Sequence, residues 1–302
     1  MKLKTVTSAI FALLFSVGAV SGANAAVPTA AAEPIKVILF GAHPDDCDIN
    51  AGGIAALYSQ AGHEVKFVSM TNGNKGHHQM KPNALAARRK GEMREAGRIL
   101  GIEYTNMDND DGELMPTLEN RLEVIRLIRD WGADVVITHR PNDYHPDHRY
   151  CSQVVQDAAY MISVPLLVPE VDALMKPVVF LYMPDRFQKP NPFSPDIVVD
   201  VTPVMQKKVD AICAHESQVF EWLPWNNGYA DQMPASREEQ RRFIGERYLG
   251  RNQAERYGQA ALKWYTAEQI ADSRYFESFE VCEYGSMPSR ERILELFPML
   301  PR

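Results

Sequence analysis

The sequence predicts an α/β fold, in which a doubly wound and mostly parallel sheet carries helices on both faces. Two observations lead to this prediction. Short apolar runs typical of buried strands alternate with helix-length segments over residues 36–162. In addition, motifs rich in His and Asp directly follow two of these runs, which is where ligand sites lie in doubly wound folds.

The first predicted strand, 36–40, is apolar throughout, as expected of a strand that is buried on both faces. The predicted strands lie at 36–40, 65–70, 103–107, 135–138, 178–182, 197–201 and 276–283. Two predicted helices end at glycines, Gly62 and Gly101, which favour helix termination. The predicted helices lie at 51–61, 83–100, 118–131, 152–162 and 203–215.

The length and composition fit one enzyme-sized globular domain. The chain has 302 residues, of which 45% are hydrophobic and 24% charged, and its formal net charge is −7. This acidic balance and the lack of any basic run disfavour nucleic acid as a partner. We predict a main domain at 35–220, with a C-terminal extension at 221–302 that packs on it.

The N-terminal residues 1–25 have the pattern of a signal peptide. Its parts are a positive start (Lys2 and Lys4), a short apolar run (9–20) and a small-residue cleavage site (23–25). A retained membrane anchor is the alternative, but the apolar run is short for a bilayer. We therefore expect export to the periplasm or the extracellular space, an extended leader at 26–34, and no stable membrane insertion after cleavage.

Four cysteines are scattered along the chain without a C-x-x-C motif, which argues against a Cys-rich zinc site. They are Cys47, Cys151, Cys213 and Cys282. Export would permit disulfides, and the sequence leaves disulfides and buried free thiols equally open.

Two motifs bring metal-binding residue types to neighbouring strand ends. Gly-Ala-His-Pro-Asp-Asp at 41–46 follows the first strand, and 139–148 follows the fourth. From these turns His43, Asp46 and His148 can converge on one ion. Two imidazoles and one carboxylate with an open fourth position are typical of a catalytic zinc, although iron or cobalt could use the same ligands.

The remaining polar residues of these motifs have candidate roles around such an ion. Of the neighbours Asp45 and Asp46, one carboxylate can bind the ion while the other faces its water. His145, as an imidazolium, could stabilise an oxyanion or protonate a leaving amine. Asp147 could either orient an imidazole or cap the following helix. His139 and Asp143 are further candidates for positioning the ligands.

These motifs also carry a family resemblance. Ala-His-Pro-Asp-Asp at 42–46 is followed by Gly52-Gly53, and His-Pro-Asp-His stands at 145–148. Matching residues between and after them are Thr71-Asn72-Gly73, Arg89, Glu92, Asp111-Gly112, Lys208 and His215-Glu216-Ser217-Gln218. On these residues the chain resembles the PIG-L/LmbE-like zinc-dependent de-N-acetylases, which have a Rossmann-like fold. The resemblance covers 35–148 well and extends weakly to 218.

The resemblance implies roles for named residues. It implies zinc on His43, Asp46 and His148. It implies Asp45 as general base, with His145 as its electrostatic or acid partner. Arg89 and Asp111 match positions that hold sugar hydroxyls or substrate phosphate; the alternative for Arg89 is a helix-surface ion pair with Glu92 or Glu95. The chain departs from the family at Cys47, where the family usually has Glu, and at Tyr144, which is out of register for polarising a carbonyl.

The expected activity is removal of an N-acetyl group from an N-acetylglucosamine-type sugar or glycoconjugate, releasing acetate. Alternatives are an amidase for another acylated amino sugar and a non-catalytic carbohydrate-binding protein of the same fold. A nucleotide-binding protein is disfavoured, because no Gly-x-Gly-x-x-Gly follows the first strand. The aromatic segment with Trp222, Trp225 and Tyr229 could stack on sugar rings, but ordinary packing is the favoured interpretation.

Overall fold

The computed structural model describes residues 33–249 and 253–302. The chain divides into two units, Met1–Glu33 and Pro34–Arg302. The predicted signal peptide at 1–25, and all but the last two residues of the predicted leader at 26–34, lie outside the described residues. Among the helices of the described part, none has both the length and the apolar character needed to cross a membrane.

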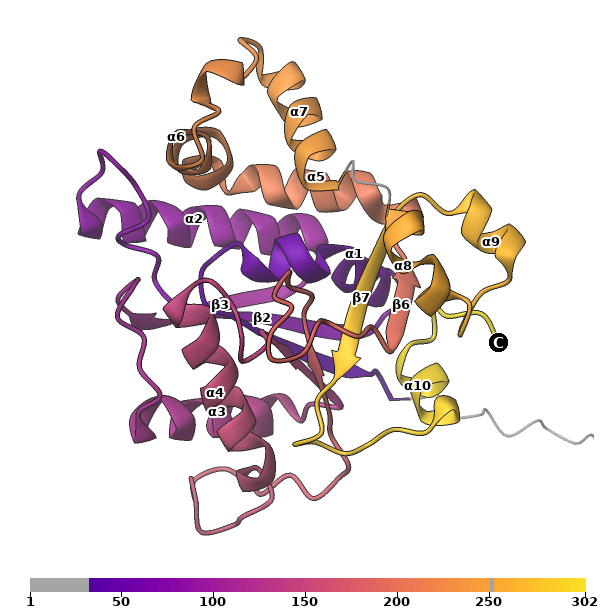
Figure 1. Ribbon diagram of the computed structural model, residues 1–302. Helices are drawn as coiled ribbons and strands as arrows, with labels where there is room; N and C mark the ends of the chain where they lie inside the picture. Colours follow the sequence, from indigo (N-terminus) through magenta and orange to yellow (C-terminus); the bar gives the residue numbers. More distant parts are fainter. Residues whose placement is uncertain (1–32, 250–252) are drawn as a thin grey trace, which may run out of the picture. The chain divides into compact units, whose positions relative to one another are not determined.

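The second unit is built around a seven-stranded sheet with the order β3-β2-β1-β4-β5-β7-β6 (Figure 1). Its strands are β1 (Lys36–Gly41), β2 (Glu64–Thr71), β3 (Glu103–Asn109), β4 (Val135–Thr138), β5 (Val179–Tyr182), β6 (Ile197–Asp200) and β7 (Phe276–Val281). The strands from β3 to β5 pair in parallel, whereas β7 runs antiparallel to β5 and β6. The predicted mostly parallel sheet is confirmed.

Helices cover both faces of this sheet, as Figure 1 shows for α1, α2 and α5 on one side and α3 and α4 on the other. The helices are α1 (Asp46–Gln60), α2 (Pro82–Leu100), α3 (Leu118–Trp131), α4 (Pro146–Met161), α5 (Met205–Ala214), α6 (Leu223–Asn226), α7 (Arg237–Leu249), α8 (Gln253–Ala261), α9 (Ala267–Asp272) and α10 (Arg290–Leu296). In β1, Val37 and Leu39 join the core under α1, while Ile38 and Phe40 join the core under α3 and α4. This double burial explains why the strand is apolar throughout.

Two helices begin earlier than predicted. α1 begins at Asp46 rather than at residue 51, and α4 begins at Pro146 rather than at residue 152. The first turns of both helices are polar, so apolar periodicity could not reveal them. The predicted metal-binding motifs therefore stand partly on helix N-termini, where the backbone fixes their side chains.

Residues 221–302 supply part of the central sheet as well as its surroundings. Their strand β7 lies between β5 and β6. From β7, the buried Glu277 accepts hydrogen bonds from the backbone N–H groups of Gly53 and Ile54 in α1, both at 2.7 Å. Lys208 of α5 donates to the same carboxylate at 2.5 Å. One carboxylate thus joins the C-terminal strand to the helix that carries Asp46.

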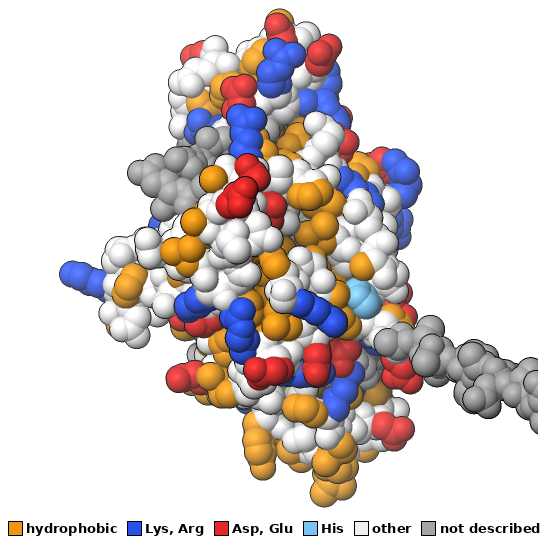
Figure 2. Space-filling model, turned by 90° about the vertical axis from the view of Figure 1, so that its right-hand side faces the viewer, with side chains coloured by type: hydrophobic (Ala, Val, Ile, Leu, Met, Phe, Trp, Pro, Cys, Tyr) orange, Lys and Arg blue, Asp and Glu red, His pale blue; other side chains and the backbone are white. Residues whose placement is uncertain are grey.

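The surface mixes charges of both signs. On the face shown in Figure 2, Lys and Arg side chains lie interspersed with Asp and Glu. The exposed charges of the described residues include short-range helix pairs, such as Arg292 with Glu295 at 2.9 Å in α10. Exposed pairs of this kind contribute little to stability, typically about 0.3–0.5 kcal/mol.

We expect Glu277→Ala to destabilise the protein strongly, by about 3–5 kcal/mol, because it leaves the Lys208 ammonium buried without its partner. The measurement is the free energy of unfolding from urea denaturation. Glu295→Ala, which removes an exposed partner of Arg292, is the matched control and should cost less than about 0.5 kcal/mol. Similar losses for the two variants would contradict a central role for Glu277.

Candidate metal centre

The two predicted motifs meet at the carboxyl ends of β1 and β4, which are hydrogen-bonded neighbours with Phe40 opposite Thr138. After β1 the chain turns into α1 through His43, and after β4 it reaches α4 through the loop at 139–145. Gly41 makes this possible, since a Cβ there would lie only 2.9 Å from the Asp46 Cβ. The helix start can therefore pack directly against the strand end.

The three predicted ligands lie together. His148 Nε2 is 3.3 Å from His43 Nδ1 and 3.4 Å from Asp46 Oδ1, and His43 Nδ1 is 3.5 Å from Asp46 Oδ2. Ligand atoms around a tetrahedral zinc with bonds of about 2.0–2.1 Å are about 3.4 Å apart. His43 Nδ1 and His148 Nε2 are therefore spaced like two ligands of one divalent ion, and Asp46 faces each of them with a different oxygen. Among the described residues, the ligand atoms that lie mutually close form the sets His43–His145–His148, Asp46–His139–His148 and His43–Asp111–His145–Asp147.

The surroundings of these ligands favour positive charge. Burial alone would lower the pKa of His43, but Asp111, Asp147 and Asp46 outweigh it and raise that pKa well above the ordinary value. Burial likewise opposes ionisation of Asp46, yet its histidine neighbours, His148 first, hold its pKa well below the usual range. Because the surrounding carboxylates stabilise the positive charge of a protonated His43, they can equally stabilise a metal cation at this place.

Carboxylates orient both ligand imidazoles from behind. His43 Nε2 lies 3.2 Å from Asp147 Oδ2 and 3.3 Å from Asp111 Oδ1. His148 Nδ1 lies 3.1 Å from Asp143 Oδ1. Such carboxylate–imidazole pairs fix the ring so that the other nitrogen faces the ion. Of the two roles predicted for Asp147, the structure places it against an imidazole and not as a helix cap.

The cap of α4 is instead His145, whose Nδ1 accepts a hydrogen bond from the Asp147 backbone N–H at 3.2 Å. Burial, together with His43 and His148, lowers the pKa of His145. This shift favours the neutral ring, and because Nδ1 accepts the Asp147 N–H, the proton of the neutral ring lies on Nε2. The predicted role of His145 toward an oxyanion or leaving amine stays a prediction.

His139, at the end of β4, is more closely involved than sequence reasoning indicated. Its ring stacks on that of His148, with centroids 4.1 Å apart, and its Nε2 is 3.3 Å from Asp46 Oδ2. The same Nε2 accepts a hydrogen bond from the Ala42 backbone N–H at 3.1 Å. In the sequence, only the position of His139 directly after a predicted strand marked it as a candidate. It stacks against the imidazole of the predicted ligand His148, and by accepting the Ala42 N–H it holds the backbone directly before His43.

Asp45 lies at the N-terminal boundary of α1, but its carboxylate makes no capping hydrogen bond. It is 3.3 Å from Nη2 of Arg89, which is only 2% exposed. Arg89 also donates to the Gly73 carbonyl and lies 3.9 Å from Asp111. A Cβ on Gly73 would be 2.4 Å from the guanidinium, so glycine is required for Arg89 to enter.

This arrangement differs from the helix-surface ion pair considered for Arg89. The surface ion pair with Glu92 is not formed, because Glu92 accepts hydrogen bonds from the Ser217 backbone N–H and hydroxyl at 2.8 and 2.6 Å. The substrate-binding role predicted for Arg89 and Asp111 stays a prediction. Both side chains are buried beside Asp45 and His43, and Nε and Nη2 of Arg89 have no hydrogen-bond partner among the described residues.

The segment after α5 closes the centre from behind. His215 Nε2 is 3.1 Å from the fully buried Asp48, which also accepts the Tyr104 hydroxyl hydrogen bond at 2.9 Å. Burial opposes charge on His215, but Asp48 outweighs it and raises the His215 pKa. Cys47 is buried, and burial raises the pKa of its thiol well above the ordinary value, which makes it an unsuitable metal ligand.

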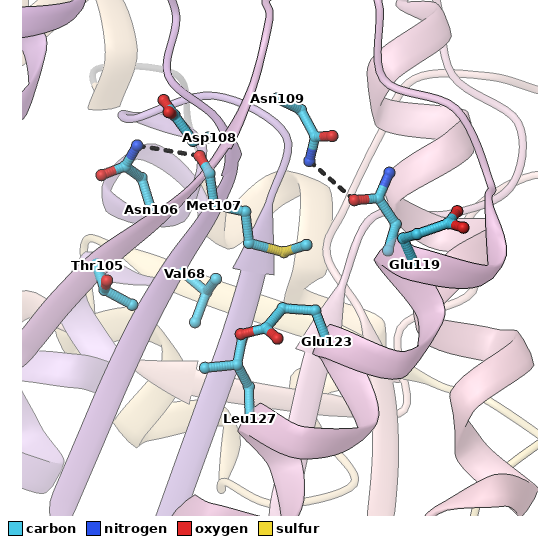
Figure 3. Close-up of a pocket in the computed structure, with 10 residues that line it drawn as sticks. Val68, Thr105, Asn106, Met107, Asp108, Asn109, Glu119, Glu123 and Leu127 are labelled. Carbon is cyan, nitrogen blue, oxygen red and sulfur yellow. Dashed lines mark hydrogen bonds between the residues drawn. The ribbon is translucent and has the colours of Figure 1, made fainter. Parts of the chain in front are cut away.

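A separate cavity of about 420 Å³ lies between β3 and α3 (Figure 3). Figure 3 shows Asn106 and Asn109 at its rim, where Asn109 donates to Asn120 at 3.0 Å. Val68 and Leu127 form apolar parts of its lining. None of the predicted site residues lines this cavity, so it is distinct from the centre described above.

The fold and the paired His/Asp motifs at its strand ends define an α/β protein of the hydrolase type with a candidate metal site. The family model described as PIG-L, GlcNAc-PI de-N-acetylase, matches residues 38–159. A diacetylchitobiose deacetylase of Thermococcus kodakarensis is 31% identical over 204 residues, covering 63% of this chain and 73% of that protein. The chain belongs to the PIG-L family of de-N-acetylases.

Two further comparisons bear on the chemistry. The solved structure of N,N'-diacetylchitobiose deacetylase from Pyrococcus horikoshii, in complex with an inhibitor, matches with a TM-score of 0.62 and 25% identity over 82% of this chain and 84% of that one. A 4-oxalmesaconate hydratase of Pseudomonas putida is 24% identical over 201 residues, covering 62% of this chain and 75% of that protein. The relatives thus include proteins named for two different reactions.

We expect the purified protein to bind one equivalent of zinc, and His148→Ala to weaken that binding at least about 100-fold, because a ligand nitrogen is lost. The measurement is competition with a chelator of known zinc affinity. His63→Ala is the matched control, since His63 precedes β2 at the opposite end of the sheet and accepts a hydrogen bond from the Ile35 backbone. Equal zinc affinity in the two variants would exclude His148 as a ligand.

Proposed function

We propose that the protein is a zinc-dependent de-N-acetylase of an N-acetylglucosamine-type sugar or glycoconjugate. The observation that carries the proposal is the close approach of His43, Asp46 and His148 at the ends of β1 and β4, with nitrogen and oxygen atoms 3.3 to 3.5 Å apart. The side chains of His43, Asp46 and Asp45 are each 11% exposed, so water can reach the centre.

A divalent ion at this centre would supply Lewis acidity, which lowers the pKa of water and polarises an acetyl carbonyl. Asp45 takes a proton from the attacking water, while Arg89 holds the Asp45 carboxylate in place. The new C–O bond forms at the acetyl carbon, and the Nε2–H of His145 donates a hydrogen bond to the developing oxyanion. Asp45 then returns its proton to the nitrogen as the C–N bond breaks, releasing acetate and an amino sugar.

The substrate class rests on the relatives. The deacetylases of Thermococcus kodakarensis and Pyrococcus horikoshii are named for diacetylchitobiose, whose amide is the acetamide of an amino sugar. The catalytic residues proposed here offer no feature specific to that sugar, and a different acylated amino sugar remains the alternative substrate. We also propose that the chain is exported, on the basis of the signal-peptide pattern at 1–25, with zinc as the ion in preference to iron or cobalt.

The test of the proposed function is acetate release by the zinc-loaded protein from N-acetylglucosamine and N,N'-diacetylchitobiose. We expect turnover with at least one of these sugars. Absence of acetate from both, together with hydration of an unsaturated dicarboxylate, would overturn the proposal in favour of the reaction for which the Pseudomonas putida relative is named.

We expect Asp45→Asn to lower kcat by about 10²–10⁴-fold, because the amide cannot accept the proton from water. Zinc content should not change, since Asp45 is not among the three ligands. Acetate release and metal analysis on the same preparations provide the measurement. Asp172→Asn, on an exposed residue of the loop between α4 and β5, is the matched control and should retain the wild-type rate. Full activity in Asp45→Asn would exclude Asp45 as the base.

A further inference from the structure

Four aromatic rings form a stacked group that the mechanism above does not use. His77 stacks on His78 with centroids 4.8 Å apart, and His78 stacks on Trp225 at 4.6 Å with an interplanar angle of only 5°. Trp222 packs against Trp225 at 5.3 Å. We call these residues, His77, His78, Trp222 and Trp225, the aromatic platform. Tyr229, which the sequence grouped with these tryptophans, is instead buried beneath Arg247.

The platform is assembled from two distant segments, and charged side chains lock them together. Arg88 of α2 donates to both carboxylate oxygens of Glu221, at 2.8 and 2.6 Å. His77 Nε2 lies 3.0 Å from the same carboxylate. Figure 1 accordingly shows α6 beside α2. These contacts hold the four stacked rings in defined positions.

The platform is connected to the metal centre by a short chain of contacts. Gln218 donates to the Gly76 carbonyl at 3.1 Å, and a Cβ on Gly76 would lie 3.2 Å from Asp111 Oδ2. The other oxygen of Asp111 is 3.3 Å from His43 Nε2. His78 follows Gly76 by two residues, so their Cα atoms are at most about 7.6 Å apart. The segment that carries His77 and His78 therefore begins next to Asp111, a direct neighbour of His43.

Packing alone does not explain the exposure of Trp225. Its indole is 52% exposed although one face is covered by His78. A tryptophan that only filled space would bury most of its surface. The next two residues, Asn226 and Asn227, are exposed as well, and the Asn227 amide donates to the Leu223 carbonyl at 2.9 Å. An open indole face of this kind suits a sugar ring, whose C–H face packs on the aromatic surface.

We propose that the aromatic platform binds a second sugar ring of the substrate, next to the N-acetylated one, so that the preferred substrate is a di- or oligosaccharide. This inference rests on the proposed de-N-acetylase function. Remote binding of this kind holds the acetamide over Asp45 and the ion, and it distinguishes an oligosaccharide from free N-acetylglucosamine.

The experiment compares kcat/KM for N,N'-diacetylchitobiose with that for N-acetylglucosamine. In Trp225→Ala we expect the ratio of the two values to fall about tenfold, as for the loss of one stacked ring, mostly through KM for the disaccharide. Trp225→Phe should recover most of the ratio. Tyr160→Ala, on an exposed aromatic residue at the far end of α4, is the matched control and should keep the wild-type ratio.

A binding measurement without turnover completes the test. Quenching of tryptophan fluorescence by the deacetylated disaccharide should occur in the wild type and be reduced in Trp225→Phe. If the wild type releases acetate but Trp225→Ala keeps the wild-type ratio, the platform proposal is wrong while the de-N-acetylase proposal stands. If the wild type releases acetate from neither sugar, the proposed function itself fails. Stronger dependence on Trp225 for an aromatic glycoside than for the disaccharide would also overturn the second-sugar proposal.

Discussion

The structure of the centre depends on one buried carboxylate, that of Asp46. It is 8% exposed and lies within 3.5 Å of nitrogens from His43, His139 and His148, while it also accepts the His43 backbone N–H at 2.7 Å. Burying an unpaired carboxylate is costly, so these contacts must form together. Because His43 and Asp46 follow β1 while the other two histidines follow β4, satisfying this one charge fixes how the two turns meet.

Further buried charged groups surround Asp46 and its histidine neighbours. Asp111 and Asp147 face His43, Arg89 faces Asp45, and Glu277 accepts hydrogen bonds from the middle of α1. Each of these groups is buried and each contacts a side chain or helix that carries a predicted functional residue. The protein thus keeps an uncommonly high density of charge in its interior at one place, and the general base proposed for the reaction is oriented by a neighbouring guanidinium and not by solvent.

Apolar patterning predicted most of the sheet, because strands buried on both faces must be apolar at every position, as in β1 and β4. The convergence of His43, Asp46 and His148 followed from the rule that parallel strand ends meet at one edge. Other features had no local signal. The pairing of Arg89 with Asp45 is a contact between different elements, and the polar first turns of α1 and α4 have no apolar period. The partner of Trp225, His78, lies far away in the sequence, which is why packing alone was favoured for this segment.

The position of β7 has a consequence for how the chain reaches this structure. The last strand made is inserted between β5 and β6, so these two strands gain their shared neighbour only when synthesis has passed residue 281. A nascent or truncated chain that ends before Phe276 leaves an edge of β5 and an edge of β6 unpaired, and such edges recruit other strands. Loss of a short C-terminal piece would therefore promote aggregation even though every residue of the metal centre is present.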